Sequence, residues 1–394
     1  MDFQTTSAIL FVVLLGVFLY ARRDRLRLQK IFFPVLYVLM YRSKVGLKAM
    51  DSWASRLPKL LKWLATAGIF IGFLGMALIA FALVQNLVKL LTNPTALPGV
   101  QLVLPVKVPG TFYVPFFYWI ISIMIIAAVH EFSHGLIARA YKMKIKSSGI
   151  AFLGIIIPIL PAAFVEPDEK EVSKRKVKQQ LSVFAAGPFS NIILGAIALL
   201  LLFAFAGPIT GALYQYNGVQ VTGFINSTAK FPAETSGIKP GEIVTGLDNN
   251  SITDIESFVQ ALKMKTPGEN LHITTNKTGY DMILAANPSN LSAPYLGIFV
   301  RQNSILKPGV QNSIGGFLPE AIVWLLGLLY WLYLLSVGIG LFNLLPLGPV
   351  DGGRMMLTTL EKYFDQKKAR FYWMLISAFF ITLILVNVFF GFTR

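Results

Sequence analysis

The chain of 394 residues contains no cysteine and only three histidines. The lack of cysteine excludes disulfides and thiolate metal ligands, so any zinc site must use nitrogen and oxygen donors. Charged residues make up only 14% of the chain, and 19 acidic residues face 35 lysines and arginines. Because 55% of the residues are hydrophobic, the composition excludes an ordinary soluble globule and predicts a polytopic α-helical membrane protein.

Apolar runs of near-membrane length predict about six transmembrane helices. They are Thr6–Tyr20, Trp63–Leu91, Phe112–Tyr141, Leu181–Ala206, Ala321–Leu345 and Phe371–Phe390. The first run is short, but no lysine or arginine precedes it and Arg22, Arg23 and Arg25 follow it. A cleaved secretory signal has the opposite charge order, so we expect a retained anchor with its amino terminus outside.

The distribution of positive charge predicts the topology. A net charge of +16 is compatible with nucleic-acid binding, but 25 of the 35 lysines and arginines lie in segments 22–62, 139–178 and 354–370. These segments flank alternate spans, which places them in the cytoplasm and both termini outside the cell membrane. The long loop assigned to the outside also holds all the Asn-x-Ser/Thr sequons noted in the chain, at Asn226, Asn249, Asn276 and Asn290.

Residues His130–His134 form an HExxH motif inside the third apolar run. Two imidazoles four residues apart lie on the same face of a helix and can bind one Zn²⁺, with Glu131 beside the metal as general base. Ionisable groups inside a membrane span are costly, which favours a functional reading over chance or packing. The spacing of ten residues from Phe132 to Lys142 places the motif about 15 Å from the basic cytoplasmic edge.

A hydrolytic zinc site needs a third protein ligand and an open position. We expect Asp351 to be that ligand, because the segment Asn343–Gly353 ends a span on the same side as the histidines. Its prolines and glycines unwind the helix and free the aspartate to turn toward the metal. Without the HExxH motif elsewhere in the chain, Asp351 would be interpreted as an ordinary loop residue.

Three segments between the spans have distinctive patterns. Ser147–Val165 is apolar but rich in glycine and proline. This composition predicts either a buried loop or a membrane-associated β-hairpin beside the site. Such a hairpin could pair with an extended substrate. Ile31–Tyr41 is too short to span, so we expect it in the cytoplasmic interface, with a re-entrant segment as the alternative. Asn93–Phe112 predicts an exterior hairpin.

Residues 207–312 have the polar, turn-rich composition of a soluble α+β domain. Strands are predicted at Val219–Ile225, Glu242–Leu247, Asn270–Thr275, Asp281–Ala285 and Tyr295–Val300, with a helix at Ile255–Leu262. The stretch Ser236–Ile243 followed by Leu247-Asp248-Asn249 resembles the core of a PDZ domain, with Ser236, Glu242 and Asn250 as mild departures. His272 falls on a predicted strand here, and we expect it to be structural or solvent-facing.

Three motifs taken together resemble those of the site-2 protease family of intramembrane zinc metalloproteases. They are the HExxH, the Gly187-x-x-x-Asn191 in the next span, and the Asn343-x-x-Pro…Asp351-Gly352 stretch after the PDZ-like insertion. They occur in the family's order, with Val350 where leucine is usual. The resemblance implies that His130, His134 and Asp351 hold Zn²⁺, that Glu131 is the catalytic base, and that Asn191 and Asn343 orient the substrate or stabilise an oxyanion.

The expected organisation has four parts. Residues 1–111 form an N-terminal membrane region, 112–207 and 313–394 are the two halves of the catalytic core, and 208–312 are the PDZ-like extracytoplasmic domain. The expected function is intramembrane proteolysis of single-span proteins or signal-peptide remnants in the bilayer, without nucleic acid. The PDZ-like domain is expected either to bind a C-terminal peptide or to act as a size filter against substrates with bulky exterior domains. Two other functions are compatible with the same sequence. One is a multipass metal-sensing receptor or transporter that uses the same histidines, and the other is a catalytically silent scaffold.

Overall fold

The computed structural model describes residues 3–32, 36–93, 95–155, 157–225 and 230–393. Within these residues, five helices are long and apolar enough to cross a membrane. They are α3 (Pro58–Thr92), α4 (Phe116–Ala140), α6 (Val177–Leu213), α10 (Phe317–Asn343) and α12 (Gln366–Thr393). The helix α1 (Phe3–Ala21) is apolar but shorter, so the sixth span stays a prediction.

Several long helices extend beyond the predicted apolar runs. The helix α6 starts four residues before Leu181 and continues to Leu213, because Lys178, Gln179 and Gln180 are good helix formers although they are polar. The helix α3 likewise begins at Pro58, a residue suited to the first helical turn. Hydropathy therefore located the apolar part of each helix but not its ends.

The contacts divide the chain into two units. Unit 1 comprises residues 1–203 and 325–394, and unit 2 comprises residues 204–324. Unit 2 is wider than the predicted domain at residues 208–312, because the end of α6, the short helix α9 (Pro308–Ile314) and the start of α10 belong to it.

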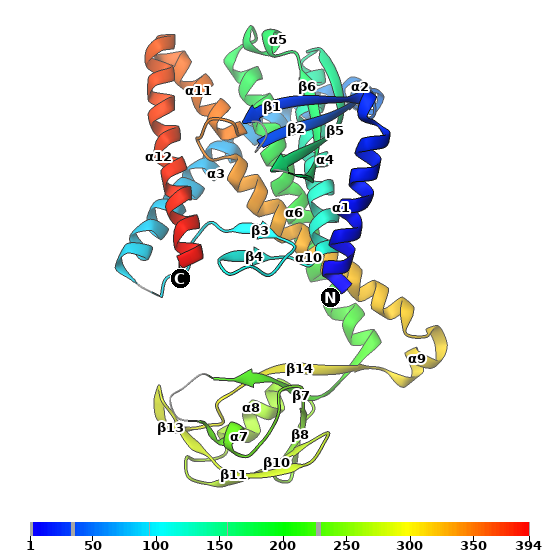
Figure 1. Cartoon of the computed structure of the whole chain (residues 1–394), viewed down its shortest axis with the longest axis vertical. Coiled ribbons are helices and arrows are strands. Elements are labelled where there is room, and N and C mark those ends of the chain that lie inside the picture. The colour runs from blue at the N-terminus through cyan, green and yellow to red at the C-terminus, as the bar shows by residue number, and fades with distance from the viewer. Residues whose placement is uncertain (1–2, 33–35, 94, 156, 226–229, 394) are drawn as a thin grey trace. The chain divides into compact units, whose positions relative to one another are not determined.

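Unit 1 contains a four-stranded antiparallel sheet beside its helices (Figure 1). The strands occur in the order β1 (Leu26–Phe32), β2 (Leu36–Ser43), β5 (Ile145–Ile155) and β6 (Ile157–Pro167). The described part of Ile31–Tyr41 is thus strand, and its place in the cytoplasmic interface or as a re-entrant segment stays a prediction. Its Val and Tyr residues favour a strand, and β5 supplies the partner, with Leu39 opposite Phe152.

Two short helices accompany this sheet. The helix α2 (Leu47–Arg56) packs on α4, with the fully buried Met50 close to Gly135. An ion pair of 3.0 Å joins Arg139 of α4 to Asp51 of α2. The helix α5 (Glu169–Ser173) follows β6 and is capped by the side chain of Asp168. The hairpin itself packs on α4 through β6, where a Cβ on Gly135 would lie 3.0 Å from Val165 Cγ1.

The prediction of an exterior hairpin at Asn93–Phe112 was wrong. The strands β3 (Leu102–Leu104) and β4 (Thr111–Tyr113) pair in parallel. A hairpin would need a tight antiparallel turn, but Pro105 and Pro109 lack the N–H groups of a ladder. The segment between them instead loops back and places Thr111 opposite Leu102.

Unit 2 has its own sheet and core. The strand order is β11 (Gly279–Ile283), β10 (Asn270–Thr275), β8 (Ile243–Leu247), β7 (Tyr214–Phe224) and β14 (Ile298–Leu306), with β9 (Asn250–Ser251) paired to β8. A second pair consists of β12 (Ala285–Asn287) and β13 (Asn290–Tyr295), and the helices are α7 (Pro232–Thr235) and α8 (Ile255–Lys263). Val219, Val244, Leu271, Ile273 and Phe258 form much of the core.

The sequons and the third histidine lie in unit 2. Asn249, Asn276 and Asn290 are exposed, and Asn226 lies outside the described residues. His272 lies on β10 with its side chain 47% exposed, and its Nδ1 is 2.6 Å from a carboxylate oxygen of Asp281 on β11. Its solvent-facing position agrees with expectation, while the aspartate partner comes from strand pairing that the sequence did not reveal.

Candidate metal centre

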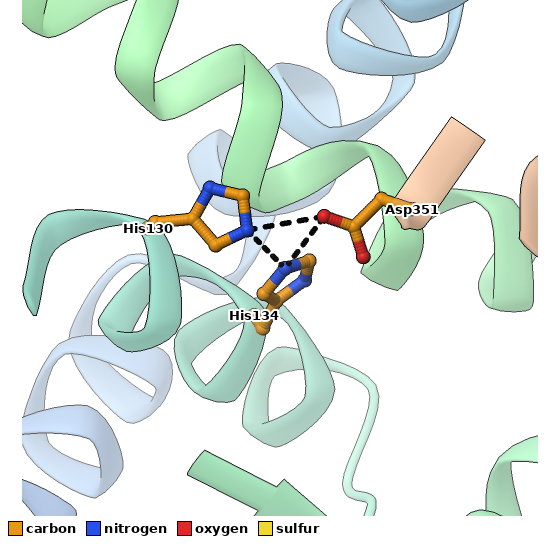
Figure 2. A group of neighbouring side chains, drawn as sticks. All are labelled: His130, His134 and Asp351. Carbon is orange, nitrogen blue, oxygen red and sulfur yellow. Dashed lines mark hydrogen bonds and ion pairs between the residues drawn. The ribbon is translucent and has the colours of Figure 1, made fainter. Parts of the chain in front are cut away.

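Side chains of α4 and α11 (Asp351–Tyr363) converge on one point. The Nε2 atoms of His130 and His134 are 3.1 Å apart, and Asp351 Oδ2 lies 3.0 Å from the first and 3.3 Å from the second. Figure 2 shows the three side chains facing one another. In a tetrahedral zinc site, ligand atoms at about 2.0–2.1 Å from the metal stand about 3.3 Å from one another. The observed spacing fits such a site.

The two histidines are held by the spacing of the HExxH motif on α4. Because they are four residues apart, both project from one helix face, and each is less than 10% exposed. The other ring nitrogen of His134, Nδ1, lies 2.7 Å from the carbonyl oxygen of Val183 on α6. A carbonyl only accepts hydrogen bonds, so Nδ1 carries the hydrogen and the Nε2 lone pair faces the site.

Glycines bring Asp351 to the histidines. The residues between α10 and α11 turn back, and a Cβ on Gly352 would lie 2.2 Å from the Leu344 carbonyl oxygen. A Cβ on Gly353 would lie 2.0 Å from the Leu347 carbonyl oxygen. Only glycine permits this close backbone packing, and the Trp373 indole N–H of α12 donates to the Gly353 carbonyl at 2.9 Å. Asp351 is therefore fixed at the first residue of α11.

Gly187 of α6 forms the third side of the site. A Cβ at this residue would lie 2.3 Å from His134 Nε2 and 2.5 Å from His130 Nε2. The missing side chain thus leaves open the space that the three ligand atoms surround. Two imidazoles and a carboxylate are suitable zinc donors, so the residues present fit the ion in both shape and chemistry.

Glu131 lies outside this cluster and contacts the sheet. Its Oε2 accepts a hydrogen bond of 2.9 Å from the backbone N–H of Val165 on β6. A cavity of about 320 Å³ adjoins it, between α4, α2 and the sheet, with Met50, Ala128, Phe132 and Phe164 among its walls. The predicted base therefore lines this largely apolar cavity and directly follows His130 in the chain.

The two predicted asparagines have different surroundings. Asn191 is fully buried on α6, with its Nδ2 3.0 Å from His130 Nδ1. Asn343 donates from its Nδ2 to the Ile339 carbonyl of its own helix at 3.0 Å. Only Asn191 contacts a member of the metal cluster here, and the substrate roles of both stay predictions.

Backbone groups were the part of this site that sequence reasoning missed. The Val183 carbonyl and the Val165 N–H have no side-chain signature. Pro188 gives no signal for the first, because the carbonyl that it leaves without a helical N–H partner is that of Phe184, four residues earlier.

Replacing Gly187 by alanine should strongly weaken zinc binding, because the added methyl group would occupy the space between the imidazoles. We expect at least about 100-fold weaker binding, measured by chelator competition on the purified chain. The control is Gly207→Ala in the same helix, where an added Cβ meets no atom within 4 Å. Unchanged zinc affinity in the Gly187 variant would refute this geometry.

Comparison with known proteins places this site in a family. Peptidase family M50 matches residues 118–386. An uncharacterized protein of Methanocaldococcus jannaschii is 27% identical over 94% of this chain and 90% of its own length. The zinc metalloprotease RasP of Shouchella clausii is 23% identical over 51% of this chain, which spans about half (55%) of that relative's length.

A solved structure also matches part of the chain. It is the PDZ domain of the SdrC-like protein from Listeria monocytogenes, 22% identical, with a TM-score of 0.19, over 22% of this chain and 88% of that domain. The family match covers more than half of the chain and includes His130, Glu131, His134 and Asp351. The chain therefore belongs to peptidase family M50, the site-2 protease family of zinc metalloproteases.

Proposed function

We propose that this protein hydrolyses peptide bonds within the transmembrane segments of substrate proteins. The observation that carries the proposal is the approach of His130, His134 and Asp351 to within 3.3 Å of one another, on helices that include candidate membrane spans. Family membership supports zinc proteolysis, and the apolar surroundings support cleavage inside the bilayer.

Each residue of the site has a role in this reaction. His130, His134 and Asp351 would hold a zinc ion, which would supply Lewis-acid polarisation of the scissile carbonyl and activation of the attacking water. Glu131 takes the proton from that water and passes it to the leaving amine. Before substrate binds, the N–H of Val165 holds the Glu131 carboxylate in place.

The open edge of β6 is a suitable place for the substrate backbone. Among the described residues, β6 ends the four-stranded sheet, and the Val165 N–H points away from β5 because it bonds to Glu131. Ala163, two residues earlier, presents its backbone groups to the same edge. Pro161 and Pro167 have no N–H, so between these two prolines an added strand would find outward-facing donors at Ala163 and Val165.

Strand pairing at this edge would serve two purposes. A transmembrane helix must unwind before its carbonyls can be attacked, and the unwound backbone needs new hydrogen-bond partners in lipid. An incoming carbonyl would also compete with Glu131 for the Val165 N–H. Substrate binding would thereby release the base beside the scissile bond.

The proposed setting is the cell membrane, with both termini and unit 2 outside and the metal nearer the cytoplasm. The support is the distribution of lysine and arginine in the sequence. Substrates would be single-span proteins or signal-peptide remnants. Unit 2 would act either as a PDZ-like receptor for a newly formed carboxyl terminus or as a filter against bulky exterior domains.

Replacing Glu131 by glutamine should keep zinc but remove proteolysis, because the amide cannot accept the water proton. We expect cleavage of a single-span reporter in proteoliposomes to fall by at least about 100-fold, with one zinc retained per chain. Cells with this variant should accumulate single-span fragments, detectable by membrane proteomics. Normal turnover in the variant would instead favour a metal-sensing receptor or transporter.

Replacing Ala163 by proline should slow cleavage by about 3- to 10-fold, the effect of one lost backbone hydrogen bond. Zinc affinity should not change. The control Ala163→Val keeps the N–H while altering the side chain. If the proline variant cleaves as fast as the valine variant, strand addition at β6 is wrong.

Deleting residues 216–301 separates the two roles of unit 2. A filter predicts faster cleavage of substrates with large exterior domains, whereas a receptor predicts slower cleavage of substrates that carry a new carboxyl terminus. Paired reporters with long and trimmed exterior parts measure both rates in the same membranes.

A further inference from the structure

The helix α6 gives each zinc-binding histidine a partner at Nδ1. The Val183 carbonyl faces His134 Nδ1 at 2.7 Å, and the Asn191 amide faces His130 Nδ1 at 3.0 Å. Metal-binding histidines generally donate this second N–H to an acceptor, which sets the tautomer and the ring orientation. The two partners are not equivalent, because a carbonyl only accepts whereas an amide side chain can either accept or donate.

The present orientation of Asn191 does not suit a zinc ligand. Its Nδ2 points at His130 Nδ1, and its buried Oδ1 has no hydrogen-bond partner among the described residues. A donor at this position requires a lone pair on Nδ1, which in a neutral ring puts the hydrogen on Nε2. That hydrogen would occupy the nitrogen needed for the metal.

We propose that Asn191 is a positioning residue that accepts the His130 Nδ1–H through Oδ1 when zinc is bound. A half-turn of the amide exchanges oxygen and nitrogen at nearly the same positions. His130 then has the same tautomer as His134, and both Nε2 lone pairs face the metal. The role of Asn191 therefore acts through the histidine and needs no contact with substrate.

The neighbouring helix holds Asn191 in reach of His130. The hydroxyl of Ser336 on α10 donates to the backbone carbonyl oxygen of Asn191 at 2.8 Å, and Ser336 is fully buried. A Cβ on Gly340 would lie 3.1 Å from the Asn191 Cβ, so α10 packs directly against this residue. The side chain can turn about its own bonds, but its backbone is fixed.

This inference rests on the proposed metal centre, and a purely structural role is the competing explanation. A buried asparagine can simply join two helices by a hydrogen bond. Such a role would affect the stability of the fold but not the affinity or ligand geometry of the metal. Zinc affinity and a spectroscopic probe therefore separate the two explanations.

The test uses the purified full chain with Asn191→Leu and Asn191→Asp. We expect the leucine variant to bind zinc about 10- to 100-fold more weakly, while the aspartate variant, which retains acceptor oxygens, stays within a few-fold of the unaltered chain. Affinity is measured by chelator competition, and Co²⁺ substitution reports ligand geometry through its visible absorption bands. The bands should shift in the leucine variant and return in the aspartate variant.

Asn387→Leu is the matched control, because Asn387 is also a fully buried helical asparagine but bonds to Leu383 and Gly99. Its zinc affinity should equal that of the unaltered chain. If Asn191→Leu does not fold, Asn191→Ala takes its place. Equal zinc affinity and equal cobalt spectra in the unaltered and apolar variants would overturn the inference, as would failure of aspartate to exceed the apolar variant. Absence of zinc binding in the unaltered chain would instead refute the proposed function.

Discussion

The crowding of two imidazole nitrogens and one carboxylate is the interaction on which the rest of this structure depends. In the tautomers that bind zinc, all three groups would present electron pairs, and they meet within 3.3 Å in a setting with little access to water. Without a cation, such an arrangement is unfavourable at low dielectric. The paired glycines of α11, the open Cα of Gly187 and the spacing of the HExxH motif all serve to produce this approach.

The helix α6 supports the centre although it contributes no proposed ligand. Val183, Gly187 and Asn191 follow one another at intervals of four residues, so they share one face of the helix. One contributes a carbonyl to His134, one leaves space for the metal, and one contacts His130. Pro188, on the adjacent position, interrupts the hydrogen bonding of the same stretch. A single helix face thus sets both the ligand orientation and the size of the site.

The success of prediction from sequence depended on how local each feature was. The two histidines were predictable because their spacing alone puts them on one helix face, and Asp351 because proline and glycine free it beside an intramembrane HExxH. The pairing of β2 with β5 could not be predicted, since more than 100 residues separate Leu39 from Phe152. The parallel pairing of β3 and β4 was missed for a related reason, because turn residues alone do not give strand direction.

The joining of β1 and β2 to the hairpin links the amino-terminal region to Glu131, the proposed catalytic base. Hydrogen bonds run from β1 through β2 and β5 to β6, and from Val165 to Glu131. A shortened chain that began at residue 118 would keep every residue with a proposed chemical role. It would nevertheless leave β5 as an exposed edge strand with unpaired backbone N–H and C=O groups. Recombinant fragments trimmed to the shared family region would therefore be prone to aggregate.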